Sequence, residues 1–305
     1  MRHFLCKGIN INKVPFFISE ASRKSKFFFV ILLLMENFFK MEENNIFRLN
    51  WDKFFKNGKT VILPIDHGTV IPVPELNDTG QLIEDVSPFV DGFVVNYGTA
   101  RTFSDQLTGK GICFRTDVYK PVYKSNQDHG SYRAFTADDA LNVNANAVMN
   151  MCYTHHQSED RIYRECASLV SECIDSELPV ILESLPFGIG KPDDYNIENI
   201  AFSVRMACEL GADVVKTAFP HDAEINDFRK IIDSSFVPVV VLGGAAMGDD
   251  RALLKMVKMA MDSGASGVAV GRNVFQHEKP ALVAKSLHAI VHEDASLDQA
   301  LNILN

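Results

Sequence analysis

The residue with the most distinctive chemistry is a lysine at the end of an apolar run. Residues 213–217 read Asp-Val-Val-Lys-Thr, so Lys216 follows two buried-type valines. A lysine held inside a concave site is desolvated, which disfavours its ammonium form and leaves a free amine able to attack a ketone or aldehyde. The resulting imine is an electron sink for carbon-carbon cleavage or formation. We expect Lys216 to be a Schiff-base nucleophile; the alternative is a rim lysine whose ammonium stays in water.

Side chains that move protons follow two other apolar runs. Asp66 and His67 stand side by side before a glycine, and Tyr153 and His155 follow a later run. Carboxylates, imidazoles and phenols are common general acids and bases. Because adjacent side chains alternate in direction along a strand, we expect only one of Asp66 and His67 to point at Lys216. The alternative is structural, with the aspartate capping a loop and the histidine bonded to backbone.

Two glycine-containing segments near the C-terminus can bind a phosphate group. Gly243 and Gly244 follow one apolar run, and Gly271 and Arg272 follow the next. Bare backbone N–H groups bind phosphate oxygens, and an arginine adds a bidentate cation. Paired glycines also occur in ordinary turns, so the arginine strengthens the case. Glu183 ends another run and could orient a substrate hydroxyl or a water, or cap a loop.

These side chains need a scaffold that gathers the ends of separate runs. From residue 60 onward, short apolar runs alternate with helical patterns, such as the one over residues 250–263. Most runs are continuously apolar, as expected for parallel strands covered on both faces. With no sign of a strand-order switch, we expect an α/β fold, a (β/α)8 TIM barrel forming one domain over residues 45–305, with its site at the carboxyl ends of the strands. The eight predicted strands are 61–65, 92–96, 112–115, 147–151, 179–182, 213–216, 237–242 and 267–270.

The first 44 residues do not continue this pattern, and we interpret them as an irregular extension. Phenylalanine is concentrated there, and an apolar run over residues 27–35 follows basic residues. That run is far shorter than the roughly 20 residues that span a bilayer, and no small-residue cleavage site follows it. We expect a start assigned too far upstream, with the protein beginning near Met41; a weak membrane-associating extension is the alternative.

Composition limits the partners and the compartment. The 305 residues carry a formal net charge of −9, which argues against nonspecific binding to nucleic acid or anionic lipid. The six cysteines form no Cys-x-x-Cys pair and no Cys/His spacing that structural zinc needs. Nor do the paired histidines at 155 and 156 have a third ligand at helical spacing. We therefore expect a cytoplasmic protein with buried free thiols and no metal site.

The motifs together resemble a known family. From about Val61 to Leu304 the chain is similar to the class I aldolases that group deoxyribose-phosphate aldolase with archaeal-type fructose-bisphosphate aldolase. The resemblance rests on Asp-His-Gly at 66–68, Val-Val-Lys-Thr at 214–217, Gly-Gly at 243–244 and, most specifically, the ten residues 267–276. It implies an imine on Lys216, Asp66 as an active-site carboxylate and a phosphate clamp made by the two glycine segments with Arg272. It also implies a homo-oligomer that needs no cofactor.

One departure from the family pattern concerns the proton donor. Archaeal-type fructose-bisphosphate aldolases carry a tyrosine acid before Pro-Arg-Gly after the fifth strand, whereas this chain has Leu185 before Pro-Phe-Gly. Leucine cannot transfer a proton. The same gap occurs in the thiolase of the autoinducer-2 pathway, which moves an acetyl group from a phosphorylated diketone to coenzyme A and whose lysine and histidine match Lys216 and His67.

The leading prediction is therefore a Schiff-base aldolase, a carbon-carbon lyase acting on a small phosphorylated ketose or related ketone. Lys216 forms the imine, Asp66 and His67 handle protons, Tyr153 assists, and Glu183 helps to bind substrate. The closest alternative is the thiolase, with coenzyme A as co-substrate. A third is a sugar-phosphate-binding barrel without catalysis, although a pure binding protein has no reason to bury an amine.

Overall fold

A computed structural model describes residues 46–71, 73–119, 130–189 and 191–304. The predicted extension over residues 1–44 lies outside the described residues, as does Cys6. Within the part that is described, no helix is long and apolar enough to cross a membrane.

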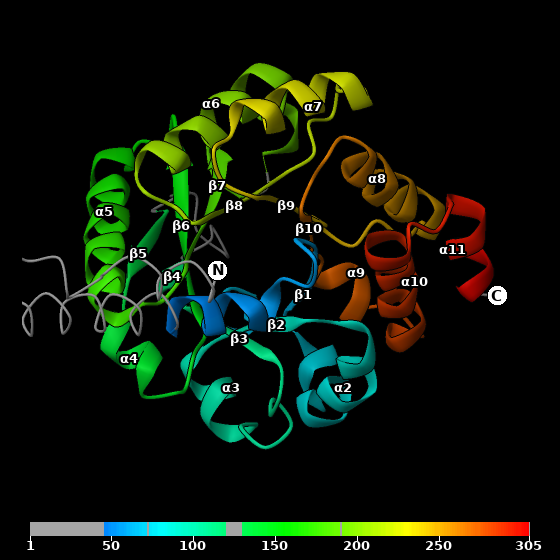
Figure 1. Ribbon diagram of the computed structural model, residues 1–305, viewed down its shortest axis with the longest axis horizontal. Coiled ribbons are helices and arrows are strands. Elements are labelled where there is room, and N and C mark those ends of the chain that lie inside the picture. The colour runs from blue at the N-terminus through cyan, green and yellow to red at the C-terminus, as the bar shows by residue number, and fades with distance from the viewer. Residues whose placement is uncertain (1–45, 72, 120–129, 190, 305) are drawn as a thin grey trace, which may run out of the picture. The chain divides into compact units, whose positions relative to one another are not determined.

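Eight parallel strands close into a barrel, with helices packed around it (Figure 1). Going around, the order is β1-β10-β9-β8-β7-β6-β3-β2, so each strand lies beside its neighbours in sequence and the last pairs with the first. The predicted TIM barrel is confirmed. The barrel strands are β1 (Thr60–Pro64), β2 (Gly92–Val95), β3 (Gly111–Arg115), β6 (Ala147–Thr154), β7 (Val180–Pro186), β8 (Val214–Thr217), β9 (Val239–Leu242) and β10 (Gly267–Ala269).

The helices follow the strands in the expected alternation. The helix predicted over residues 250–263 is present as α8 (Asp250–Asp262), and the Asp249 side chain accepts a hydrogen bond from the Ala252 N–H at 3.0 Å. The other helices are α2 (Thr79–Val86), α3 (Tyr97–Thr102), α4 (Ala137–Leu141), α5 (Glu159–Ser176), α6 (Ile197–Glu209), α7 (Ile225–Ser234), α9 (Arg272–Phe275), α10 (Pro280–Glu293) and α11 (Leu297–Leu304). Residues 46–54 are also mostly helical and precede β1.

Two features differ from the predicted strands. β6 and β7 run three and four residues further, to Thr154 and Pro186, and stay paired to their ends. Their outward side chains find polar partners, since the Thr154 hydroxyl lies 2.5 Å from that of Ser203 on α6. A short antiparallel hairpin, β4 (Asp117–Tyr119) with β5 (Ser131–Arg133), also follows β3 and was not predicted. Tyr153 and Glu183 therefore lie within strands, not in loops after them.

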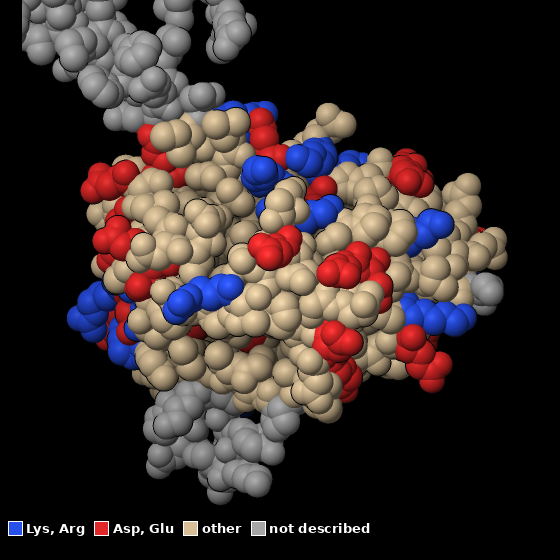
Figure 2. Space-filling view, turned by 90° about the horizontal axis from the view of Figure 1, so that it is seen from below, with Lys and Arg blue, Asp and Glu red and all other residues tan. Residues whose placement is uncertain are grey.

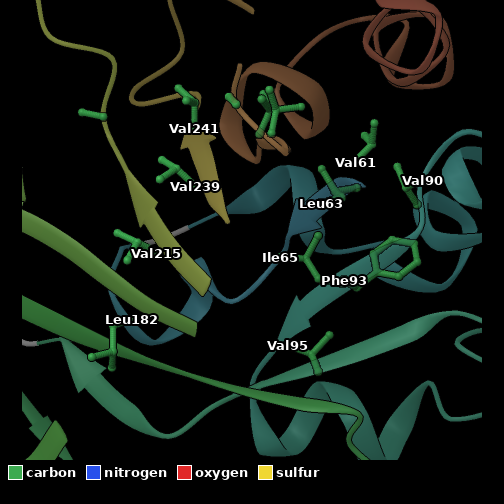
Figure 3. Close-up of a cluster of buried hydrophobic side chains, with 14 of the residues drawn as sticks. Val61, Leu63, Ile65, Val90, Phe93, Val95, Leu182, Val215, Val239 and Val241 are labelled. Carbon is green, nitrogen blue, oxygen red and sulfur yellow. The ribbon is translucent and has the colours of Figure 1, made fainter. Parts of the chain in front are cut away.

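The core has two parts. A large cluster fills the space between barrel and helices, and Figure 3 shows side chains from β1, β2, β7, β8 and β9 within it. A smaller cluster fills the barrel interior, and Phe54 closes the end at which β2 and β3 begin. A Cβ on Gly111 would stand 2.8 Å from the Phe54 ring, so the absence of a side chain there lets the ring enter.

The surface carries both signs of charge. On the face in Figure 2, Lys and Arg are interspersed with Asp and Glu, and no continuous basic area covers it.

Candidate active site

Charged side chains point into the barrel from the carboxyl ends of its strands. Ile62, Cys113, Ile181 and Val214 belong to the inner core cluster. Because alternate residues of a strand face the same side, the residues two positions further along β3, β7 and β8 also face inward. These are Arg115, Glu183 and Lys216, and Asp66 joins them from the end of β1.

The inward charges form one connected network. The Lys216 Nζ lies 2.9 Å from Oε1 of Glu183, whose Oε2 accepts a 2.6 Å hydrogen bond from Nη2 of Arg115. The Arg115 Nε donates to Oδ2 of Asp66 at 2.7 Å, and its Nη1 donates to Oδ1 of Asp117 at 3.4 Å. None of the five side chains is more than 7% exposed. Such close pairing offsets the desolvation cost of burying charges.

Two of the carboxylates are held in their ionised form. Burial raises the pKa of Asp66, but Arg115, His67 and Lys216 lower it more, to about 2. Burial likewise raises the pKa of Glu183, and the positive charges of Lys216 and Arg115 bring it below its usual value. Both groups are therefore negative at neutral pH, beside the amine of Lys216.

Asp117 and Tyr153 behave differently. Burial is the main cause that raises the pKa of Asp117 to about 6, with Arg115 opposing and Glu183 adding to the rise. Burial and the nearby Asp117 charge raise the pKa of the Tyr153 phenol well above its usual value. Within the described segments, Asp117 Oδ2 and the Tyr153 hydroxyl are buried without hydrogen-bond partners.

Asp66 and His67, the predicted proton-handling pair after β1, point in different directions, as expected for adjacent residues. Asp66 enters the ionic network, whereas the His67 ring packs edge-on against Phe275 with ring centroids 5.3 Å apart. Its Nδ1 is 3.5 Å from Oδ1 of Asp66. Burial, together with the charges of Arg272 and Lys216, lowers the pKa of His67 despite the opposing carboxylates. A neutral imidazole beside the phosphate segment follows.

His155 is directed away from this network. Its backbone has a positive φ of 59°, and its ring stacks on Phe202 at 4.9 Å and tilts against Phe187 at 5.3 Å. Of the two proton donors considered after β6, the structure therefore brings Tyr153 and not His155 to the interior.

The two predicted phosphate segments lie side by side. The Asn273 side chain joins them, donating to the carbonyls of Gly243 and Ala245 at 2.9 and 3.0 Å and accepting from the Met247 N–H at 2.8 Å. Gly244 has a φ of 68°, which favours glycine. A Cβ on Gly271 would stand 2.9 Å from the His67 ring. Sequence reasoning passed over Asn273, although it directly follows Arg272.

Arg272 extends from this junction without a carboxylate partner among the described residues. Its guanidinium is partly buried, its Nε has no hydrogen-bond partner there, and burial lowers its pKa. An unpaired, partly buried arginine beside exposed glycine backbone is suited to bind an anion.

Sequence reasoning missed Arg115 and Asp117. Arg115 ended the third predicted strand, and a charged residue at the carboxyl end of a barrel strand is itself a signal of a site residue. Asp117 follows two residues later at the start of the unpredicted hairpin. In the described segments no cluster of three or more potential metal ligands occurs among His, Cys, Asp and Glu.

Comparison with known proteins gives the family. A sequence profile described as DeoC/LacD family aldolase matches residues 60–277. A relative named class 1 fructose-bisphosphate aldolase from Halobacterium salinarum is 40% identical over 258 residues, covering 81% of this chain and 95% of its own. A 2-amino-3,7-dideoxy-D-threo-hept-6-ulosonate synthase from Archaeoglobus fulgidus is 28% identical over 254 residues, covering 83% and 94%.

The solved structures with a similar fold include aldolases. A Schiff-base-forming fructose-1,6-bisphosphate aldolase superposes with a TM-score of 0.72 at 26% identity, covering 81% of this chain and 100% of its own. An archaeal fructose 1,6-bisphosphate aldolase gives the same TM-score at 25% identity, covering 81% and 99%. The predictions of a class I aldolase type and of a carbon-carbon lyase are confirmed, and enzymes of this type need no cofactor. The chain belongs to the DeoC/LacD family of aldolases.

Proposed function

We propose that this enzyme cleaves or forms a carbon-carbon bond in a small phosphorylated ketose through an imine on Lys216. The observation that carries the proposal is the position of Lys216, buried at the carboxyl end of β8 and 2.9 Å from the carboxylate of Glu183. Three of the proteins named above are fructose-bisphosphate aldolases, which act on a phosphorylated ketose, and this supports the substrate class.

Glu183 is placed to serve the lysine rather than to bind substrate directly. Both of its carboxylate oxygens are engaged, one by Lys216 and one by Arg115. As the amine adds to a carbonyl, Oε1 can take a proton from Nζ and return it to the carbinolamine oxygen, so that water leaves and the imine forms. The negative charges of Glu183 and Asp66 then stabilise the cationic imine.

The substrate phosphate would bind at Gly243, Gly244 and Gly271 with Arg272. Arg272→Gln removes the cation and keeps a side chain of similar reach. We expect the KM for a phosphorylated ketose to rise about 10- to 100-fold with a smaller change in kcat, because one charge-assisted pair is lost from substrate binding. Arg251→Gln on the exposed face of α8 is the matched control. Equal KM values in wild type and Arg272→Gln would place the phosphate elsewhere.

Borohydride trapping tests the imine. The full chain is incubated with phosphorylated ketoses and diketones, reduced, and read by intact mass and peptide mapping. We expect a substrate-dependent adduct on Lys216. Absence of any adduct, with binding of the same compounds demonstrated by calorimetry, would contradict the imine and favour the non-catalytic sugar-phosphate-binding barrel.

Leucine at 185 keeps the thiolase in consideration as a second candidate. Both reactions pass through Lys216, so trapping alone does not separate them. Acetyl-coenzyme A formed from a phosphorylated diketone only when coenzyme A is added would identify the thiolase. An aldehyde released from a phosphorylated ketose without coenzyme A would identify the aldolase.

We further propose a cytoplasmic homo-oligomer with its catalytic barrel over residues 45–305. The five described cysteines are buried free thiols, which suits a reducing compartment. Exposed apolar side chains on the barrel's helices, Ile174 at 72% among them, are compatible with subunit contacts. Light scattering of the full chain measures the assembly.

A further inference from the structure

Three carboxylates lie in the barrel mouth, and one of them has a fully buried oxygen without a hydrogen-bond partner in the described segments. Asp66 has Oδ2 on Arg115 and Oδ1 3.5 Å from the His67 ring. Glu183 has one oxygen on Lys216 and the other on Arg115. Asp117 gives Oδ1 to Arg115 at 3.4 Å, but within the described segments its buried Oδ2 has no partner. Buried polar atoms without partners are rare in folded proteins, and each calls for a physical explanation, a catalytic role among them.

A second buried polar atom without a hydrogen-bond partner among the described residues, the hydroxyl of Tyr153, lies on β6. Tyr153 on β6 is fully buried, and its hydroxyl has no partner in the described part of the chain. It faces inward because it lies four residues beyond Met149, whose sulfur is 3.9 Å from the Lys216 Nζ. In the β6–β7 register Tyr153 pairs with Leu185, so it brings a phenol to the level where β7 has only an apolar side chain.

Oδ2 of Asp117 and the hydroxyl of Tyr153 lie in the same region of the barrel mouth. β3, which leads directly to Asp117, pairs with β6, and the charges of Asp117 and Glu183 both act on the Tyr153 phenol. The carboxylate oxygen of Asp117 accepts a hydrogen bond, and the phenol of Tyr153 donates one. A single substrate hydroxyl both donates and accepts, so it can pair with both groups. Lys216 is itself only 4% exposed and must still meet substrate, so burial does not separate this region from the reaction.

We propose that Asp117 and Tyr153 form a subsite for a substrate hydroxyl, with Asp117 as the base that removes its proton and Tyr153 as the donor to its oxygen. The inference rests on the proposed function, since the hydroxyl is that of the carbon whose bond to the enamine carbon is made or broken. It assigns the substrate to hydroxylated ketoses and their aldehydes.

In the cleavage direction the proton moves from the substrate hydroxyl to Asp117 and then to the enamine carbon. The O–H bond of the hydroxyl breaks and its proton goes to Oδ2 of Asp117. The O–H electron pair becomes the second bond of the leaving aldehyde's carbonyl, and the electrons of the carbon-carbon bond move to the imine nitrogen. Asp117 then holds one proton, which the enamine carbon takes up, and water hydrolyses the imine to free Lys216. Tyr153 keeps its proton throughout, as its raised pKa requires.

The titration of Asp117 agrees with this assignment. A general base works best when its pKa lies near the working pH. Burial raises the pKa of Asp117 to about 6 against the pull of Arg115 on β3 and with the push of Glu183 on β7; the Ser131 hydroxyl on β5 and the Met151 backbone on β6 oppose the rise. Asp66, held at about 2, is a much weaker base.

Two variants test the proposal against wild type. Asp117→Asn should lower kcat for ketose cleavage by about 10²- to 10⁴-fold, the usual contribution of a positioned base. Borohydride trapping of the ketose on Lys216 should stay within about threefold of wild type, because imine formation does not use this hydroxyl. Wild-type kcat/KM should also rise with pH through about 6 as the carboxylate of the free enzyme ionises, and this limb should vanish in Asp117→Asn.

Tyr153→Phe removes only the unpaired hydroxyl. Its stability should equal or exceed that of wild type, because a buried unsatisfied group is lost. Because Tyr153 donates to the oxygen that becomes the aldehyde carbonyl, Tyr153→Phe should lower kcat/KM for ketose cleavage at least about tenfold, while trapping of the ketose on Lys216 stays within about threefold of wild type. Tyr132→Phe, at an exposed tyrosine on β5, is the control.

The results separate the two proposals. Cleavage by Asp117→Asn within threefold of wild type, or trapping on Lys216 that falls in parallel with cleavage, would overturn the hydroxyl subsite and leave the imine mechanism standing. A wild-type enzyme that never forms a Lys216 adduct would overturn the proposed function itself.

Discussion

Lys216→Met should lose ketose cleavage by at least about 10⁴-fold, because removing the nucleophile of a covalent mechanism leaves only binding and electrostatic effects. The borohydride adduct should disappear with it. Methionine keeps the unbranched stem that crosses the inner core beside Met149, so the loss is chemical rather than a cavity effect. Steady-state cleavage and intact mass after reduction measure the two effects.

Two further variants decide how that result is interpreted. Lys216→Arg keeps a positive charge beside Glu183 but cannot supply a neutral amine, so it should be equally inactive. Lys230→Met removes a lysine whose side chain is 78% exposed on α7 and should act like wild type. Turnover by Lys216→Met above a hundredth of wild type, with the protein folded, would refute an imine on this residue.

The sequence was a good guide to the barrel because the information is local. Most of the strands are covered on both faces and therefore begin as continuously apolar runs, and they end near a glycine or a polar residue. It was a poorer guide to strand length. Cys152 and Ser184 do not read as strand interior, yet they lie in β6 and β7, where the Ser184 hydroxyl donates to the Ser203 carbonyl at 2.8 Å. Such partners come from a distant helix and leave no local pattern.

Site residues, too, were predictable where the signal is local and were missed where it depends on distant contacts. Lys216, Asp66 and Glu183 were predicted from single strand ends, and the structure brings them together, while their roles stay a proposal. Arg115 was passed over because its value lies in contacts with Asp66 and Glu183, 49 and 68 residues away. Pairings at that separation appear only once the barrel closes.

Arg115→Met should destabilise the fold more than a surface change can. It leaves Asp66, Asp117 and Glu183 buried without the guanidinium that pairs with all three, and breaking a buried ion pair by removing one partner costs about 3–5 kcal/mol. Urea unfolding at pH 7 measures the change. Arg205→Met, which removes a half-exposed partner of Glu209 on α6, should change stability by no more than about 0.5 kcal/mol.

The effect of Arg115→Met should depend on pH in a defined direction. In wild type the pKa of Asp66 is lowered from 3.8 to about 2, so its contribution to stability is present above pH 4 and is lost as pH falls toward 2. Without Arg115 the pKa values of Asp66 and Glu183 rise, and these groups cost stability as pH rises through them. The difference between variant and wild type should therefore be largest near neutral pH and narrow in acid.

A double variant identifies uncompensated charge as the cause. Asp117→Asn removes one of the three carboxylates stranded by Arg115→Met, so the pair of changes should be less destabilising than the sum of the single changes. Simple additivity would mean that Arg115 stabilises the barrel through packing of its stem rather than through the charges it holds together. In that case the same urea series would show a difference in stability between Arg115→Met and wild type that does not vary with pH.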